Sequence, residues 1–175
     1  MTKLIVICGL PGTGKSTLAD ALSKHMKITC ISKDGIKESL YDYLQLKTLE
    51  DSRRIGKQSV DILLNLAEKH IQQGLDVIIE APFRVESDYD NFIDWKSRYD
   101  IKFYAFICAV SVDVRKERFV SRPRHAAHHD SERRFAPESD EIYHKLPENK
   151  LWLDTAKPID DLLSEVLETL GQTRA

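Results

Sequence analysis

The sequence reads Gly9-Leu10-Pro11-Gly12-Thr13-Gly14-Lys15-Ser16-Thr17 directly after the apolar run 4–8. This stretch fits the pattern G-x-x-x-x-G-K-[ST], and it lies between a β-rich run and a segment with apolar residues at helical spacing. Glycines leave room for backbone N–H groups to close around an anion, and the N-terminus of the following helix adds partial positive charge. The stretch therefore predicts a strand that turns tightly into a phosphate-binding loop and then into a helix.

The residues of this loop have separate expected roles. Lys15 would bridge the β- and γ-phosphates of a nucleotide, and the Ser16 hydroxyl would occupy one ligand position of Mg²⁺. The motif thus predicts a nucleoside triphosphate and Mg²⁺ as the bound groups. The predicted nucleotide-binding residues are Gly9, Gly12, Thr13, Gly14, Lys15, Ser16 and Thr17.

Length and composition indicate one α/β domain over residues 1–175, because 42% hydrophobic and 31% charged residues are ordinary values for a globular protein. A net charge of -2 argues mildly against a protein that coats nucleic acid. No stretch approaches the roughly 18 apolar residues of a membrane span, and the N-terminal apolar run is too short for a secretory signal. We therefore expect a cytoplasmic monomer without a membrane partner. Its three cysteines, Cys8, Cys30 and Cys108, lie in apolar runs and are expected to be buried, reduced thiols.

A short strand-like run over 28–31 follows the first helix and leads to Ser32-Lys33-Asp34-Gly35. Open α/β sheets bind ligands outside the carboxyl ends of their strands. A carboxylate there can accept the proton of a hydroxyl that attacks a phosphate, so Asp34 is a candidate general base. The alternative is that Asp34 only caps a helix predicted over 36–44.

The third predicted strand, 75–79, is almost continuously apolar, as expected of a parallel strand covered on both faces. It leads to Glu80, which therefore lies where a carboxylate holds Mg²⁺ directly or through water. Arg84 follows closely enough to face the same cleft and to bind an anionic group of a substrate. The alternatives are an acidic residue in a loop and a merely exposed arginine.

The other segments predict the remaining helices and strands of an α/β fold. A long helix is predicted over 50–73, with one apolar face. Arg53 and Lys57 of this helix are expected to be solvent-exposed. An amphipathic helix from Val85 to Trp95 is expected to place its aromatic residues in the core. Strands are predicted over 101–110 and 150–153, and a last helix begins at Pro158. Strands that alternate with helices indicate a parallel sheet with right-handed crossovers.

The segment from 113 to 134 is basic, with seven cations against four acidic residues. Arg118 and Arg122 are spaced i, i+4, so both project from one helical face and can point at transferring phosphates. Phosphoryl transfer needs such cations because charge spreads over the γ-phosphoryl oxygens. A solvated basic helix is the alternative.

The stretch His125-Ala126-Ala127-His128-His129 lies within this basic segment. Its histidines share a helical face, but no cysteine or suitably spaced carboxylate completes a zinc site. We expect a mobile polar loop here.

Several of these features together resemble the small P-loop kinases, in particular polynucleotide 5′-kinases, chloramphenicol phosphotransferases and zeta-toxin-like kinases, within the AAA-type P-loop NTPase superfamily. The resemblance covers nearly the whole chain. It implies a three-layer α/β fold with a five-stranded parallel sheet of order 2-3-1-4-5 and a mobile Arg-rich lid over roughly 112–136. The matching features are the loop 9–17, Asp34 with Lys37 three residues on, the strand end at Glu80, the Arg118/Arg122 pair and the closing strand Leu153-Asp154-Thr155.

The resemblance also implies roles for individual residues. The catalytic residues would be Lys15, Asp34, Arg118 and Arg122, and the substrate would be contacted by Asp34, Lys37 and Arg84. Two positions depart from the pattern. Polynucleotide kinases carry arginine where this chain has Lys37, which puts bidentate recognition of a substrate phosphate in doubt. Many relatives carry aspartate where this chain has Glu80, so the metal contact would move outward or pass through a water.

The function expected from these features is that of an ATP-dependent kinase, a phosphotransferase that moves the γ-phosphate to an alcohol group of a small molecule. A polynucleotide 5′-hydroxyl kinase is the alternative within this class, although the net charge does not favour it. A non-catalytic ATP-binding regulator is the alternative outside it. A GTP-driven switch would need Asn-Lys-x-Asp, whereas Asn149-Lys150 is followed by Leu-Trp.

The acceptor pocket would be formed by the helices after the second and third strands, roughly 36–43 and 53–59. No signature in these segments names a ligand. Tyr41 and Tyr43 either line that pocket or pack in the core.

Overall fold

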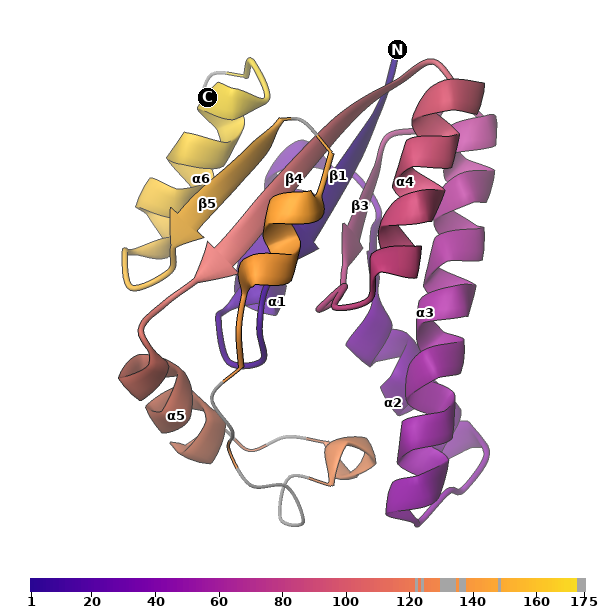
Figure 1. Ribbon diagram of the computed structural model, residues 1–175, viewed down its shortest axis with the longest axis vertical. Helices are drawn as coiled ribbons and strands as arrows, with labels where there is room; N and C mark the ends of the chain where they lie inside the picture. Colours follow the sequence, from indigo (N-terminus) through magenta and orange to yellow (C-terminus); the bar gives the residue numbers. More distant parts are fainter. Residues whose placement is uncertain (122, 124, 130–134, 136–137, 148, 173–175) are drawn as a thin grey trace.

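The computed structural model describes residues 1–121, 123, 125–129, 135, 138–147 and 149–172. A central sheet carries helices on both of its faces (Figure 1). In chain order the elements are β1 (Thr2–Cys8), α1 (Lys15–Met26), β2 (Cys30–Ser32), α2 (Lys33–Tyr43), α3 (Leu49–Gln72), β3 (Val77–Glu80), α4 (Glu86–Arg98), β4 (Ile101–Ala109), α5 (Val112–Ser121), the 3₁₀ helices η1 (Ala126–His128) and η3 (Glu141–Lys145), β5 (Lys150–Asp154) and α6 (Ile159–Thr169).

The sheet is parallel throughout, and its strand order is β2-β3-β1-β4-β5. This confirms the predicted order 2-3-1-4-5. Strand β1 is central, pairing Ile5 with Ile78 of β3 on one side and with Tyr104 of β4 on the other. All strands therefore end at the same edge, where the loops after β1, β2 and β3 meet.

Alternate residues of β1 pack into two separate cores, which produces the three layers. Leu4 and Val6 lie in the core beneath α3 and α4, whereas Ile5 and Ile7 lie in the core beneath α1 and α6. All four side chains are fully buried. Burial of an aliphatic side chain stabilises a fold by about 1.5–3 kcal/mol, so both faces of β1 hold the central strand in place.

The observed elements differ from the predicted ones mainly at their ends. Helix α2 begins at Lys33, three residues earlier than predicted, and β3 extends to include Glu80. In α4 the three aromatic side chains are buried as predicted, but Val85 and Ile93 are more than half exposed. These two aliphatic residues lie outside the aromatic face that packs on the sheet.

The cysteines are free thiols, as expected, but only two of them are buried. Cys8 and Cys108 lie in the central strands, whereas Cys30 is half-buried because β2 forms an edge of the sheet. Burial raises the pKa of the Cys30 and Cys108 thiols to about 12, so both stay protonated at neutral pH. In the part of the chain that the structure describes, no helix combines the length and apolar character needed to cross a bilayer.

Candidate nucleotide and phosphoryl-acceptor site

The loop between β1 and α1 has the backbone geometry that its glycines predict. Gly9, Gly12 and Gly14 have φ angles of 138°, 82° and 86°, which side-chain-bearing residues rarely adopt. A Cβ atom on Gly9 would lie 2.3 Å from the carbonyl oxygen of Cys108. The loop therefore requires glycine at Gly9 both for its backbone angle and for its packing on β4.

Internal hydrogen bonds close the loop around the carbonyl oxygen of Leu10. This oxygen accepts from the Thr13 amide at 3.3 Å, from the Thr13 hydroxyl at 2.7 Å and from Lys15 Nζ at 3.1 Å. Lys15 is only 8% exposed. Its ammonium group is thus held at the loop, next to the N-terminus of α1.

Glu80 ends β3 beside the phosphate-binding loop. In the sheet it pairs with Ile7 of β1 and with Ser32 of β2, whose hydroxyl donates to Glu80 Oε2 at 2.8 Å. The side chain is 2% exposed, and this burial raises the pKa of the Glu80 carboxyl. Lys15 and the Ser32 hydrogen bond oppose the shift, while nearby Asp34 adds to it.

A buried carboxylate beside a phosphate-binding loop fits a divalent cation, because a cation would stabilise its charged form. Mg²⁺ prefers oxygen ligands and is usually bound by one or two side chains together with phosphate oxygens and waters. Glu80 and the Ser16 hydroxyl supply ligands of this kind. Among the described residues, no three His, Cys, Asp or Glu side chains form a preassembled metal site.

Asp34 lies in the first turn of α2, at the carboxyl end of β2. The cap of this helix is Ser32, whose hydroxyl accepts from the Gly35 amide at 3.4 Å. Asp34 instead forms an ion pair with Lys33 at 2.9 Å, and its side chain is 32% exposed. The capping alternative is therefore wrong, and the carboxylate is partly exposed at the edge where β1, β2 and β3 end.

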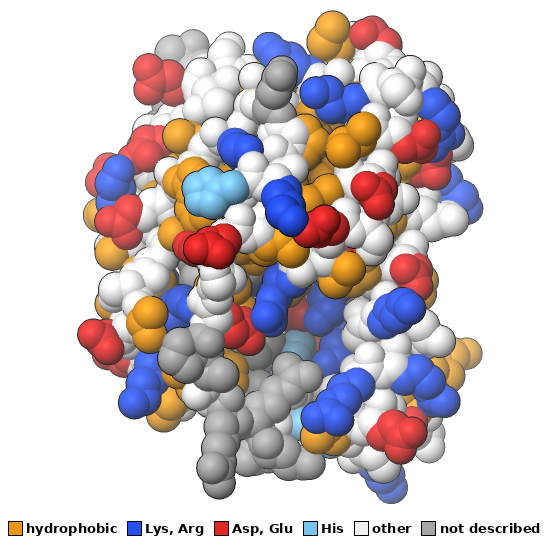
Figure 2. Space-filling view, in the orientation of Figure 1, with side chains coloured by type: hydrophobic (Ala, Val, Ile, Leu, Met, Phe, Trp, Pro, Cys, Tyr) orange, Lys and Arg blue, Asp and Glu red, His pale blue; other side chains and the backbone are white. Residues whose placement is uncertain are grey.

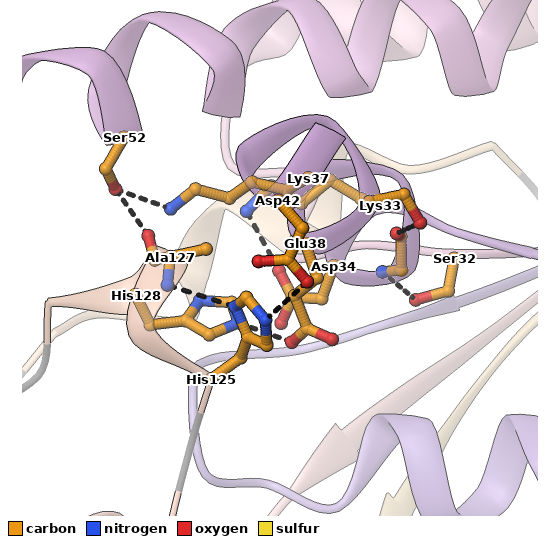
Figure 3. A network of polar contacts seen from close by, with 12 residues as sticks. Ser32, Lys33, Asp34, Lys37, Glu38, Asp42, Ser52, His125, Ala127 and His128 are labelled. Carbon is orange, nitrogen blue, oxygen red and sulfur yellow. Dashed lines mark hydrogen bonds and ion pairs between the residues drawn. The ribbon is translucent and has the colours of Figure 1, made fainter. Parts of the chain in front are cut away.

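Lys37 lies one turn further along α2 and is almost completely buried. Its Nζ donates to the Ser52 hydroxyl of α3 at 2.8 Å, and that hydroxyl donates to the carbonyl oxygen of Ala127 at 2.6 Å. Three distant segments are joined in this way (Figure 3). The contact was not predicted, because no local pattern marks Ser52.

The histidine stretch packs against α2 and is not the mobile polar loop predicted from the sequence. His128 Nε2 lies 2.8 Å from Glu38 Oε1, and His125 Nε2 lies 3.1 Å from Asp42 Oδ2. Figure 3 shows both imidazoles directed from their segment toward α2. Ala127 between them is fully buried. The expectation failed because the partners lie more than eighty positions earlier in the chain.

The sequence predicts that Tyr41 and Tyr43 of α2 either line the acceptor pocket or pack in the core. Tyr41 is buried in a small core with Ile55 and Ala127, and its hydroxyl lies 3.1 Å from His129 Nε2. Tyr43 is 87% exposed. Tyr41 therefore packs, and neither tyrosine has the placement expected of a pocket wall.

Arg118 lies beside the phosphate-binding loop. Its Nη2 donates to the carbonyl oxygen of Thr155 at 2.9 Å, and its Nη1 lies 3.6 Å from the position a Cβ of Gly14 would occupy. Helix α5 ends at Ser121, and Arg122 lies outside the described residues. The predicted pairing of the two arginines is therefore not described, and neither are Arg124, Arg133 and Arg134.

Arg84 is partly exposed and forms an ion pair with Glu138 at 3.1 Å. The pair borders a cavity of about 600 Å³ between the start of α4 and η3. Arg53 and Lys57 are exposed, as predicted. Lys and Arg side chains also gather around the hollow below the centre of the face in Figure 2.

Comparison with known proteins agrees with this geometry. A family model described as an AAA domain matches residues 4–137. A kinase candidate from Chloroflexus aurantiacus j-10-fl has a similar structure, with a TM-score of 0.78, 27% sequence identity and coverage of 96% of this chain and 98% of that one. No curated protein matches the chain.

Two more distant structures share the fold. A sugar kinase from Janibacter sp. HTCC2649 is 18% identical, with a TM-score of 0.64 and coverage of 98% and 95%. The APS kinase of Mycobacterium tuberculosis, in complex with AMPPNP and APS, is 18% identical, with a TM-score of 0.62 and coverage of 98% of both chains. With the family match over 4–137 and the sheet order 2-3-1-4-5, the chain belongs to the AAA domain family of P-loop NTPases and has the fold of the small P-loop kinases.

Proposed function

We propose that this protein is an ATP-dependent kinase that transfers the γ-phosphate to a hydroxyl group of a small molecule. The observation that carries the proposal is the meeting of Lys15, Glu80 and Asp34 at the carboxyl edge of β1, β2 and β3. Burial, Lys15 and Asp34 all act on the pKa of the Glu80 carboxyl, so the three groups share one electrostatic environment. The kinases of similar fold support the same reaction class.

In the proposed reaction the loop amides and Lys15 bind the β- and γ-phosphates. Mg²⁺, held by Ser16 and Glu80, would neutralise charge on these phosphates. Asp34 accepts the proton of the acceptor hydroxyl as its oxygen forms a bond to the γ-phosphorus. The bond from the γ-phosphorus to the β–γ bridging oxygen breaks, and ADP leaves with that electron pair.

We propose that Arg118 stabilises the transferring phosphoryl group. Its guanidinium is anchored on Thr155 and lies next to Gly14, so little reorganisation is needed when a triphosphate binds. Cations fixed in place stabilise developing charge more effectively than solvated ones. We propose the same role for Arg122, within a lid that closes over the phosphates and limits hydrolysis by excluding water.

Asp34, Lys37 and Arg84 are the residues we propose on the acceptor side. Asp34 is accessible for proton transfer. Lys37 contributes by fixing α2 against α3 rather than through a free ammonium group. Arg84 would reach an anionic acceptor group only by exchanging its ion pair with Glu138.

The test is ADP formation from ATP and Mg²⁺ with a panel of acceptors: sugars, nucleosides, nucleotide sugars, aminoglycoside and chloramphenicol-type antibiotics, and a 5′-hydroxyl oligonucleotide. We expect one small-molecule class to stimulate turnover and Asp34→Asn to lower the stimulated rate by roughly 10²-fold or more. Asp90→Asn, an exposed change on α4, is the matched control and should leave the rate unchanged.

Stimulation by the oligonucleotide alone would favour a polynucleotide kinase. If Asp34→Asn keeps the acceptor-stimulated rate of ADP formation, Asp34 is not the general base. ATP binding without turnover for every acceptor would favour a nucleotide-binding regulator.

A further inference from the structure

Arg115 is a buried cation in contact with the phosphate-binding loop. It lies on α5 and is 3% exposed, although arginines are rarely buried without a partner of opposite charge. Its Nε donates to the carbonyl oxygen of Pro11 at 3.1 Å, and its Cζ lies 5.3 Å from the ring centre of Phe135. No carboxylate among the described residues pairs with it.

The bond to Pro11 also fixes the next amide of the loop. In a planar trans peptide the C=O and the N–H point in opposite directions, and none of the described peptide bonds is cis. Because the Pro11 carbonyl points to Arg115, the Gly12 N–H points away from α5. That N–H is one of the donors that a bound phosphate would use.

The orientation of the Pro11–Gly12 peptide needs a restraint because Gly12 is conformationally flexible. With a φ of 82° and no Cβ, its backbone has access to many conformations that would turn the Pro11–Gly12 peptide. The main chain of Arg115 lies close by, since a Cβ on Gly12 would be 3.1 Å from its carbonyl oxygen. Helix α5 therefore limits the loop both by packing and by the hydrogen bond from the Arg115 side chain.

The charge of Arg115 gives a second reason to connect it with phosphate. The described residues provide no carboxylate for this buried guanidinium, and the Pro11 carbonyl and the Phe135 ring compensate its charge only in part. Phosphate groups bound in the loop would bring negative charge close to the guanidinium. Binding would then relieve part of the cost of burying it.

We propose that Arg115 is a positioning residue of the phosphate-binding loop, which orients the Gly12 N–H through the Pro11 carbonyl and favours binding of polyphosphate over the nucleoside alone. This inference rests on the proposed nucleotide site. Arg118 of the same helix is bonded to Thr155 and lies beside Gly14, so two arginines of α5 lie next to the loop.

The experiment compares binding of ATP, inorganic tripolyphosphate and adenosine to the whole protein, by calorimetry for the two phosphates and by ligand-observed NMR for adenosine. Arg115→Met removes the charge and the donor, and we expect Kd for ATP and tripolyphosphate to rise roughly ten- to hundredfold. The affinity for adenosine should not change. Arg115→Lys keeps a charge and a donor and should restore part of the phosphate affinity.

Two variants separate this role from general effects. Lys116→Met makes the same charge change on an exposed neighbour in α5 and should alter Kd for ATP by less than about twofold. Phe135→Leu keeps the charge but removes the ring that helps to hold the guanidinium at the Pro11 carbonyl, so it should weaken phosphate binding to a smaller extent than Arg115→Met.

Unchanged ATP affinity in Arg115→Met would overturn the inference, as would equal loss for ATP and adenosine or an equal effect of Lys116→Met. If Arg115→Met does not fold, Arg115→Lys and Phe135→Leu test the proposal in its place. Unchanged phosphate affinity in both variants would contradict it. Absence of ATP binding in the wild type would remove the nucleotide site itself, whereas normal ATP binding in Arg115→Met would remove only the role of Arg115.

Discussion

The buried carboxyl of Glu80, which we propose as a ligand of Mg²⁺, lowers the stability of the ligand-free protein. This carboxyl is buried, and the Ser32 hydroxyl with the charges of Lys15 and Lys33 offsets the loss of water only in part. The folded protein therefore binds a proton at Glu80 more tightly than the unfolded chain does. Because the folded-state pKa is raised, the free energy of unfolding falls as pH rises from the ordinary glutamate range through that raised pKa.

We predict that Glu80→Gln raises the stability of the ligand-free protein at neutral pH by about 1 kcal/mol, which corresponds to roughly 2–4 °C in Tm. The gain should shrink as the pH is lowered, because the wild-type carboxyl then becomes neutral as well. Turnover with Mg²⁺ and ATP should fall by about tenfold or more. Thermal unfolding of both proteins between pH 5 and 8 measures the difference, and a gain that does not depend on pH would contradict the assignment.

At the scale of elements, the junction of α2, α3 and the segment 125–129 keeps the helix that carries Asp34 in place. Ser52 is central to it, because its hydroxyl accepts from Lys37 Nζ and donates to the carbonyl oxygen of Ala127. All of these groups are buried, so none can exchange its partner for water without cost.

Replacing this hydroxyl should therefore destabilise the fold. We predict that Ser52→Ala lowers the free energy of unfolding by about 1–3 kcal/mol, since the Ala127 carbonyl and Lys37 each lose a buried partner. Ser39→Ala, an exposed change on α2, should stay within about 0.5 kcal/mol of the wild type. Urea unfolding compares the two, and equal effects would show that the junction contributes nothing of its own.

The same junction marks the limit of what the sequence predicts. The loop 9–17 and the apolar periodicities are local patterns, so they indicate the parallel sheet and the carboxyl-edge positions of Glu80 and Asp34 without knowledge of distant contacts. Ser52, Arg115 and the histidine stretch contribute through partners 75, 104 and 83–90 positions away. Such contacts depend on how complete elements pack, which no single window of sequence records.

At the scale of the whole molecule, the parallel sheet brings the phosphate-binding loop and the carboxyl groups of Glu80 and Asp34 to one edge, where the proposed reaction would use them. Helices α2 and α5 flank this edge (Figure 1), and His125 and His128 contact α2. Phosphoryl transfer requires both ligands to be held together while water is excluded. The proposed kinase reaction would use both properties of this edge.

The most direct test of this central claim follows the fate of the γ-phosphate. The protein would be incubated with Mg²⁺, the acceptor panel and ATP whose γ-phosphate carries heavy oxygen, and the products would be separated by mass spectrometry. We predict that the label appears in one phosphorylated small molecule in equal amount to the ADP formed. Label found only in inorganic phosphate, or ADP formation that no acceptor changes, would contradict the kinase assignment.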